Sequence, residues 1–107
     1  MFQKICSLND LTPEIGVPAL INGEQVAIFR LKDNRVYAIA NYDPFSNANV
    51  LARGITGNLK GLDVVASPMY KQHFDLVTGQ CLEDDSISIK TYSVKVEGES
   101  VLVAASS

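Results

Sequence analysis

Apolar and polar residues alternate along much of the chain, which is the pattern of half-buried strands. The stretch EQVAIFRLK at 24–32 shows this alternation, and RVYAIA at 35–40 follows it after Asp33 and Asn34. Asn readily adopts the left-handed conformation that tight hairpin turns require. We therefore predict two strands joined by a two-residue turn at Asp33 and Asn34.

Other segments of the chain have the same strand pattern. They are GVPALI at 16–21, LDVVASP at 62–68, HFDLVTG at 73–79, and the two arms of a last hairpin at 93–97 and 100–104. Asn22-Gly23 is a strong hairpin signal, and Thr78-Gly79 is predicted to turn the chain again. Capping and acidic residues at the spacing of a helix start occur only in SLNDLTPEIG at 7–16, which predicts a single helical turn.

Short strands separated by turns about every eight to twelve residues are typical of a small antiparallel barrel or sandwich. The chain has no repeat, low-complexity tract or linker, and its 107 residues provide material for one hydrophobic core. A chain of this length buries roughly two-thirds of its unfolded surface. We predict one all-β domain spanning residues 1–107.

Composition and charge exclude several classes of function. The nine Lys and Arg residues are scattered and the net charge is −3, so a nucleic-acid partner is not expected. No run of about 18 apolar residues is present, so no membrane partner is expected. The first ten residues lack the apolar stretch of a secretory signal. Cys6 and Cys81 are far apart in sequence, and we expect two free thiols in a reducing cytoplasm.

Two proline-containing loops carry the most informative motif. The first reads Asp43-Pro44-Phe45, within NYDPFSNANVLARGITG, and the second reads Ser67-Pro68-Met69-Tyr70, within VVASPMYKQHFDLVTGQCL. With the closing ISIKTYSVKVEGESVLV, these segments resemble the Rieske fold along the whole chain. In Rieske ferredoxins the two loops carry Cys-Pro-His and Cys-Pro-x-His. The resemblance implies a Rieske-like β-sandwich or barrel whose two loops form a vestigial cluster-binding end.

This resemblance places the four former ligand positions at Asp43, Phe45, Ser67 and Tyr70. A Rieske 2Fe–2S centre needs two thiolates and two imidazoles. A carboxylate is a hard donor, a phenyl ring is no donor, and a neutral hydroxyl binds iron weakly. A tyrosine with a pKa of about 10 is rarely a phenolate at neutral pH. We therefore predict that this chain binds no cofactor.

A mixed metal site at Asp43, His73 and Cys81 is the alternative, and it would make the chain an electron carrier. His73 is adjacent to Phe74 on a predicted strand, so their side chains point to opposite faces. If Phe74 points inward, His73 lies on the surface.

The acidic run at 83–85 either guides a basic partner or forms a solvated turn.

Six residues of the two loops are candidates for binding a partner protein. We call them the loop tip: Tyr42, Pro44, Phe45, Pro68, Met69 and Tyr70. These side chains either pack together in the volume that a cluster would fill, or remain exposed as an apolar surface. Exposed apolar patches usually mark binding surfaces, and aromatic residues and Met are enriched at interface centres.

The chain also resembles the small subunits of bacterial NAD(P)H-dependent nitrite reductases, in PEIGVPALINGEQVAIFR, NYDPFSNANVLARG, VASPMYKQHF and CLEDD. This resemblance implies a non-catalytic cytoplasmic subunit. Its partner would be a large subunit that carries FAD, siroheme and an iron–sulfur cluster and reduces nitrite to ammonium. The residues themselves provide no nucleophile–base pair and no phosphate-binding loop. A stand-alone adaptor for an unrelated protein is a further alternative.

Overall fold

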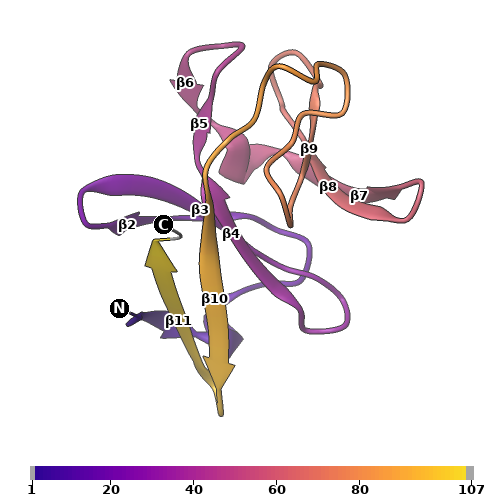
Figure 1. Cartoon of the computed structure of the whole chain (residues 1–107). Helices are drawn as coiled ribbons and strands as arrows, with labels where there is room; N and C mark the ends of the chain where they lie inside the picture. Colours follow the sequence, from indigo (N-terminus) through magenta and orange to yellow (C-terminus); the bar gives the residue numbers. More distant parts are fainter. Residues whose placement is uncertain (1, 106–107) are drawn as a thin grey trace.

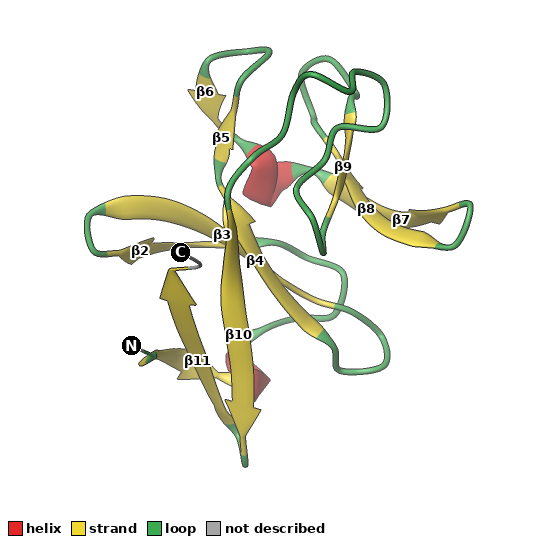
Figure 2. Cartoon of the chain, viewed as in Figure 1, coloured by secondary structure: helices red, strands yellow, loops and turns green. Residues whose placement is uncertain are grey.

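The computed structural model describes residues 2–105, which form an almost entirely antiparallel all-β structure (Figures 1 and 2). Six strands make a strongly curved, barrel-like sheet in the order β1-β11-β10-β4-β3-β2. Their bounds are β1 Gln3–Ser7, β2 Val17–Ile21, β3 Glu24–Arg30, β4 Val36–Ala40, β10 Thr91–Glu97 and β11 Ser100–Ala105. The predicted all-β class is confirmed.

The middle of the chain forms two smaller sheets above one end of the barrel-like sheet (Figure 1). One is a hairpin and the other has three strands. Their bounds are β5 Tyr42–Asp43, β6 Ala48–Asn49, β7 Ile55–Leu59, β8 Leu62–Ala66 and β9 His73–Asp75. Two short 3-10 turns complete the fold, η1 at Leu8–Asp10 and η2 at Leu51–Arg53. Figure 2 shows η2 at the junction between the barrel-like sheet and the smaller sheets.

Strand β3 is buried on both faces and so connects two hydrophobic cores. Val26 and Ile28 belong to the core inside the barrel-like sheet. Ala27 and Phe29, on the opposite face, belong to the core beneath the smaller sheets. Successive side chains of a strand point to opposite faces, so the continuous apolar run VAIF serves both cores.

The predicted hairpins are confirmed, but one turn is larger than predicted. Asn22 and Gly23 have φ angles of 51° and 81° and close a two-residue turn. The turn between β3 and β4 was predicted at two residues, which is wrong. The Leu31 N–H donates to the Arg35 carbonyl at 2.8 Å. The backbone N–H of Asn34, which has a φ of 66°, donates to the Leu31 carbonyl at 2.9 Å. The loop therefore has three residues, because a type I turn is followed by a left-handed residue.

Several elements differ from the sequence-based expectations. Strand β1 was not predicted, and a register shift between Lys4 and Cys6 interrupts its alternation. Strand β7 was not predicted either, because Gly57 and Asn58 are poor strand formers. The returning strand predicted at 73–79 is shorter than expected, because only His73–Asp75 form strand β9. The predicted helical turn is the short η1, where the Ser7 N–H donates to Asp10 Oδ2 at 3.0 Å.

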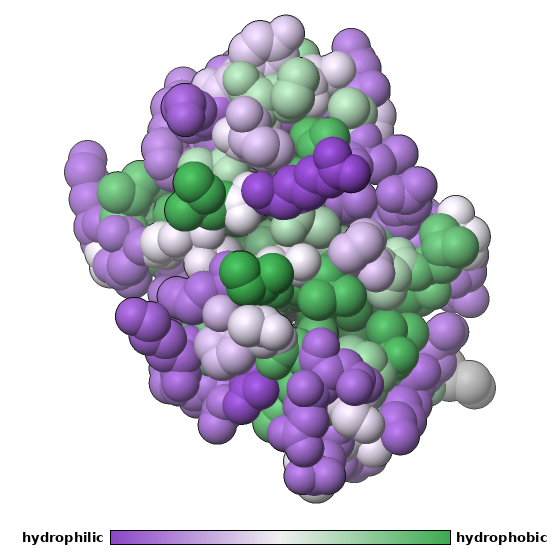
Figure 3. Space-filling view, turned by 180° about the vertical axis from the view of Figure 1, so that it is seen from behind, coloured by the Kyte–Doolittle hydropathy of each residue, from purple (hydrophilic) through white to green (hydrophobic). Residues whose placement is uncertain are grey.

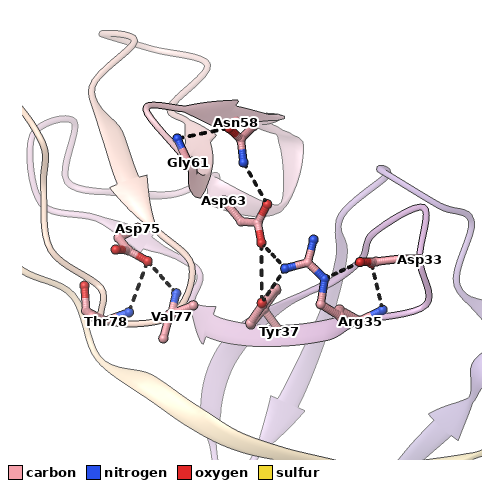
Figure 4. A network of polar contacts seen from close by, with 9 residues as sticks. All are labelled: Asp33, Arg35, Tyr37, Asn58, Gly61, Asp63, Asp75, Val77 and Thr78. Carbon is pink, nitrogen blue, oxygen red and sulfur yellow. Dashed lines mark hydrogen bonds and ion pairs between the residues drawn. The ribbon is translucent and has the colours of Figure 1, made fainter.

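A polar network ties the β3–β4 loop to the three-stranded sheet (Figure 4). Arg35 binds Asp33 through Nε and Asp63 through Nη1, each at 2.5 Å. The Asp63 side chain is only 13% exposed, and Asn58 donates to its other oxygen at 3.4 Å. This network fixes β8 against the barrel-like sheet. Over the described range 2–105, no helix is long and apolar enough to cross a membrane.

Candidate functional site

The two proline-containing loops lie at the same end of the molecule, one between β5 and β6 and the other between β8 and β9 (Figure 1). They have the same backbone structure. In the first loop, residues 43–47, the Asn47 N–H donates to the Asp43 carbonyl at 2.8 Å. In the second loop, residues 67–71, the Lys71 N–H donates to the Ser67 carbonyl at 3.0 Å. Asn47 and Lys71 have φ angles of 55° and 62°, so each loop ends in a left-handed residue.

The first side chain of each loop holds the turn together. Asp43 Oδ1 accepts the Phe45 N–H at 2.9 Å, and Ser67 Oγ accepts the Met69 N–H at 3.2 Å. Asp and Ser commonly bind the backbone two residues onward, and proline at the second position fixes a φ that suits the turn. The polar residue before each proline is therefore explained by local structure.

The predicted turn at Thr78-Gly79 is confirmed, and it repeats this arrangement a third time. The Gly79 N–H donates to the Asp75 carbonyl at 2.8 Å, and Asp75 Oδ1 accepts the Val77 N–H at 2.8 Å. Gly79 has a φ of 80°, and a Cβ there would lie 2.0 Å from the Ile89 carbonyl oxygen. The third turn therefore requires glycine, since it combines a left-handed conformation with close backbone packing.

Asp43 and Ser67, the two former thiolate positions, are hydrogen-bonded to each other. Both are almost fully buried, at 0% and 1% exposure, and Ser67 Oγ donates to Asp43 Oδ2. Both carboxylate oxygens of Asp43 then have a donor, one from Phe45 and one from Ser67. A buried carboxylate is tolerated only when it is hydrogen-bonded, so this contact explains how Asp43 can lie in the interior.

The two former imidazole positions have separate environments. Phe45 is half-buried and packs on the core, with its ring centroid 6.2 Å from that of Phe74. Tyr70 is 60% exposed. A Rieske cluster needs two thiolates and two imidazoles, and the four positions instead supply a hydrogen-bonded carboxylate–hydroxyl pair, a phenyl ring and a surface phenol. These residues do not fit a 2Fe–2S cluster.

The alternative metal site is not assembled either. His73 Nδ1 lies 2.6 Å from Glu83 Oε2, and the backbone N–H of His73 donates to Glu83 Oε1 at 2.8 Å. Cys81 is buried, with its Sγ 3.7 Å from Glu83 Oε1. Asp43 is engaged with Ser67. Within residues 2–105, no group of three or more His, Cys, Asp and Glu residues is arranged to hold a metal ion.

His73 and the acidic run have structural roles. Phe74 points inward, and His73 lies at the surface as expected, where its side chain is 30% exposed and paired with Glu83. Partial desolvation opposes the ionisation of Glu83, but hydrogen bonds from the His73 N–H and ring outweigh it and lower the pKa of Glu83. Asp84 accepts hydrogen bonds from Ser86, which lower the pKa of Asp84.

Both cysteines are free thiols, as predicted. Burial is the main cause that raises the pKa of the Cys81 thiol, and it also raises the pKa of Cys6. A thiol that stays protonated is a poor nucleophile and a poor metal ligand. Neither cysteine therefore has the properties of a reactive or ligating residue.

The loop tip divides into two parts. Tyr42, Met69 and Tyr70 are 44%, 56% and 60% exposed, and Pro68 is also exposed. Pro44 and Phe45 are half-buried. The Tyr42 hydroxyl donates to Asn47 Oδ1 at 2.6 Å, so the first loop orients this exposed ring. The exposed part of the loop tip therefore consists of Tyr42 and the second loop.

Sequence reasoning missed the residues that position these loops. Asn41 is 3% exposed, and its side chain accepts the Ala52 N–H at 2.7 Å and donates to the Asn49 carbonyl at 3.3 Å. It therefore fixes the β5–β6 hairpin relative to η2. The only sequence signals for the loops are a polar residue and a proline at positions one and two, and Asn47 at position five of the first loop.

Comparisons with known proteins agree with this geometry. The family model of the Rieske-like [2Fe-2S] domain matches residues 1–104. The chain is 47% identical over 97 residues to the nitrite reductase (NADH) small subunit of Salmonella typhimurium, which covers 90% of each protein. It is 44% identical to the Escherichia coli protein NirD, whose NMR structure superposes with a TM-score of 0.89 over 100% of both chains.

A further relative is the NAD(P)H nitrite reductase large subunit of Klebsiella oxytoca. The identity is 38% over 102 residues, covering 95% of this chain and 11% of that protein. Sequence identity at this level over nearly the whole chain establishes the family. The chain belongs to the Rieske-like [2Fe-2S] domain family and, within it, to the small subunits of NADH nitrite reductases.

Proposed function

We propose that this chain is the small subunit of a bacterial NAD(P)H-dependent nitrite reductase. It supports a large subunit that reduces nitrite to ammonium, and it takes no part in the chemistry itself. The Salmonella typhimurium and Escherichia coli relatives, each aligned over 90% of this chain, are named as nitrite reductase (NADH) small subunits. It acts in the cytoplasm, where NADH and the reductase are expected together.

The Klebsiella oxytoca relative supports the choice of partner. In that protein a segment similar to this chain is covalently part of a polypeptide named as the large subunit. A domain that occurs both as a separate chain and inside the larger one is expected to work in contact with it. We expect the large subunit to carry FAD, siroheme and an iron–sulfur cluster.

The observation that carries the proposed role is the hydrogen bond from Ser67 to Asp43. It closes the volume between the loops with side chains that do not fit a cluster. The chain then contributes a folded surface to the complex and no electron-transfer centre. We place its docking surface at the exposed residues of the loop tip, Tyr42, Pro68, Met69 and Tyr70.

Titration of the purified large subunit with this chain tests the proposal. Nitrite-dependent NADH oxidation is expected to rise with added chain and to saturate, while the chain alone is colourless and inactive. A visible absorption band with stoichiometric iron in the purified chain would overturn the cluster-free role. An unchanged rate and no complex on gel filtration would overturn the assignment of partner.

The docking surface is tested by paired substitutions. Met69→Ala with Tyr70→Ala removes two exposed side chains of the loop tip. Val96→Ala on β10 is the matched control, since Val96 is 40% exposed and lies on a strand of the barrel-like sheet. The loop-tip variant is expected to need more chain for half-maximal activation, and the control is expected to behave as the unmodified chain. Equal curves would place the interface elsewhere.

A further inference from the structure

A polar pocket of about 230 Å³ lies between β2, the β5–β6 hairpin and η2. It is lined by Gly16, Pro18, Gln25, Asn49, Ala52 and Arg53, with the buried Asn41 among them. None of these residues is acidic. The whole chain has a net charge of −3, but the lining of this pocket includes a guanidinium and no carboxylate.

Asn41 determines how the amide groups of this pocket are presented. Its Nδ2 donates to Gln25 Oε1 at 3.2 Å. The oxygen of Gln25 is therefore occupied as an acceptor, and its NH2 group has no hydrogen-bond partner within residues 2–105. Because the oxygen of this amide faces Asn41, both N–H groups of its NH2 remain available to bind a ligand. Gln25 thus presents N–H groups to the pocket.

Arg53 is the second donor, and it differs from the other two arginines. Arg30 donates to Asn34 and to two backbone carbonyls, and Arg35 binds Asp33 and Asp63. The guanidinium of Arg53 has neither an ion pair nor a hydrogen bond with any residue in the described part of the chain. Its backbone is fixed, because its N–H donates to the Val50 carbonyl at 2.9 Å. The pocket therefore contains a positioned, unpaired cation beside unpaired amide donors.

Exposed apolar side chains flank these donors. Ile15 is 58% exposed and directly precedes Gly16, and Ile55 is 74% exposed and lies two residues after Arg53. Their backbone segments are neighbours, since Thr56 Oγ1 donates to the Glu14 carbonyl at 3.5 Å and a Cβ on Gly16 would be 2.2 Å from the Ala52 carbonyl oxygen. Figure 3, the view from behind, shows apolar side chains gathered among polar ones on that side of the molecule.

A charged hydrogen-bonding centre with an apolar surround is the usual composition of an energetically dominant interface site. Arginine binds carboxylates in a planar, two-bond geometry, and exclusion of water by neighbouring apolar groups strengthens that pair. An unpaired arginine on a net-acidic chain selects a partner group of negative charge. These features favour an acidic side chain presented by a protein surface.

On the basis of the proposed function, we propose that the Arg53 pocket receives an Asp or Glu side chain of the nitrite reductase large subunit. Arg53 and the Gln25 amide bind the carboxylate, and Ile15 and Ile55 cover it with apolar surface. The pocket is continuous with the loop tip through the β5–β6 hairpin, where Tyr42 pairs with Asn49. The two surfaces would then form one interface.

The test measures affinity for the purified large subunit at low and high salt. Arg53→Gln is expected to raise the Kd about tenfold or more and to weaken its salt dependence. Gln25→Glu, which places a carboxylate beside Arg53, is expected to weaken binding similarly. The matched control is Lys4→Gln, which removes one exposed positive charge on β1 and is expected to stay within about twofold. Thermal unfolding checks that all variants are folded.

The outcomes separate this inference from the proposed function. If the unmodified chain does not bind the large subunit, the proposed function fails and this inference fails with it. If the unmodified chain binds and Arg53→Gln matches Lys4→Gln, only the inference is overturned. It is also overturned if calorimetry finds that nitrite binds the isolated chain through Arg53 while Arg53→Gln assembles normally, because the pocket would then be a small-anion site.

Discussion

Ser67 donates a hydrogen bond to the buried carboxylate of Asp43, and this contact joins two loops that are 24 residues apart in the sequence. The same two side chains also hold their own loops, through the N–H groups of Phe45 and Met69. Each residue therefore satisfies a local turn and a contact between loops. The end of the domain is stabilised by ordinary polar and apolar packing.

Replacing Ser67 with Ala is expected to destabilise the fold. The substitution removes the donor to Asp43 Oδ2 and the acceptor of the Met69 N–H, which leaves a buried carboxylate oxygen without a protein partner. Loss of one partner of a buried polar group costs about 1 to 3 kcal/mol. Urea unfolding at neutral pH measures the change. Ser93→Ala, at an exposed position of β10, is the control, and equal midpoints for the two variants would contradict the assigned role of Ser67.

Phe45 and Tyr70 occupy equivalent positions in the resemblance to Rieske proteins, but they are expected to respond differently to truncation. Phe45→Ala removes a ring that packs on Phe74, so we expect a loss of about 2 kcal/mol in the free energy of unfolding. Tyr70 is largely exposed, so Tyr70→Ala should change stability little and affect only assembly with the large subunit. Unfolding and binding measured on both variants test this, and a strongly destabilised Tyr70→Ala would show that the second loop is part of the core.

The glycine of the third loop provides a sharp test of the turn geometry. Gly79 and Gly98 have φ angles of 80° and 60°, but only at Gly79 would an added Cβ meet a neighbour, the Ile89 carbonyl oxygen at 2.0 Å. Gly98→Ala is expected to cost about 1 to 2 kcal/mol from its left-handed backbone alone. Gly79→Ala is expected to cost more than about 3 kcal/mol, since backbone must also move. Thermal unfolding compares them, and similar losses would show that the contact at Ile89 relaxes easily.

The sequence was sufficient for those features that depend on local pattern and chemistry. The alternation in β3 and β4 predicts both strands, and the pair Asn22-Gly23 predicts its turn, since both signals are local. The unsuitability of Asp43 and Phe45 as cluster ligands follows from donor chemistry alone. The resemblance to Rieske proteins then places these residues at one end of the fold.

Other features depend on contacts that no local pattern encodes. The bond from Ser67 to Asp43 joins loops from different sheets, and a polar residue before a proline is equally consistent with a solvated turn. Asn41 resembles any turn residue until its buried amide is seen bonded to Gln25 and Asn49. Strand β1 is not recognisable from the sequence, because a register shift between Lys4 and Cys6 interrupts its alternation. Arg53 becomes informative only when every other arginine is found paired.

The pairing of Glu83 with His73 predicts a decrease in stability in acid. Partial desolvation opposes the ionisation of Glu83. Hydrogen bonds from the backbone N–H and the ring of His73 outweigh it and hold the pKa of Glu83 below its usual value of 4.5. A carboxylate whose pKa is lower in the folded state stabilises the fold fully above its unfolded pKa. This contribution is lost as the pH falls through the lower folded value. Hydrogen bonds from Lys90 and Tyr92 likewise lower the pKa of Glu24, and hydrogen bonds from Ser86 lower the pKa of Asp84.

We therefore expect the urea midpoint to fall between about pH 5 and about pH 3. Glu83→Gln should lower the midpoint at neutral pH and make its fall in acid shallower, because the variant has no carboxylate to protonate at this position. Asp85→Asn is the control, since it removes an exposed neighbouring carboxylate that makes no hydrogen bond to any group within residues 2–105. Because Glu83 is nearly half exposed, solvent screening keeps its effect small. A Glu83→Gln profile parallel to that of the unmodified chain would show that the contact with His73 contributes nothing to acid sensitivity.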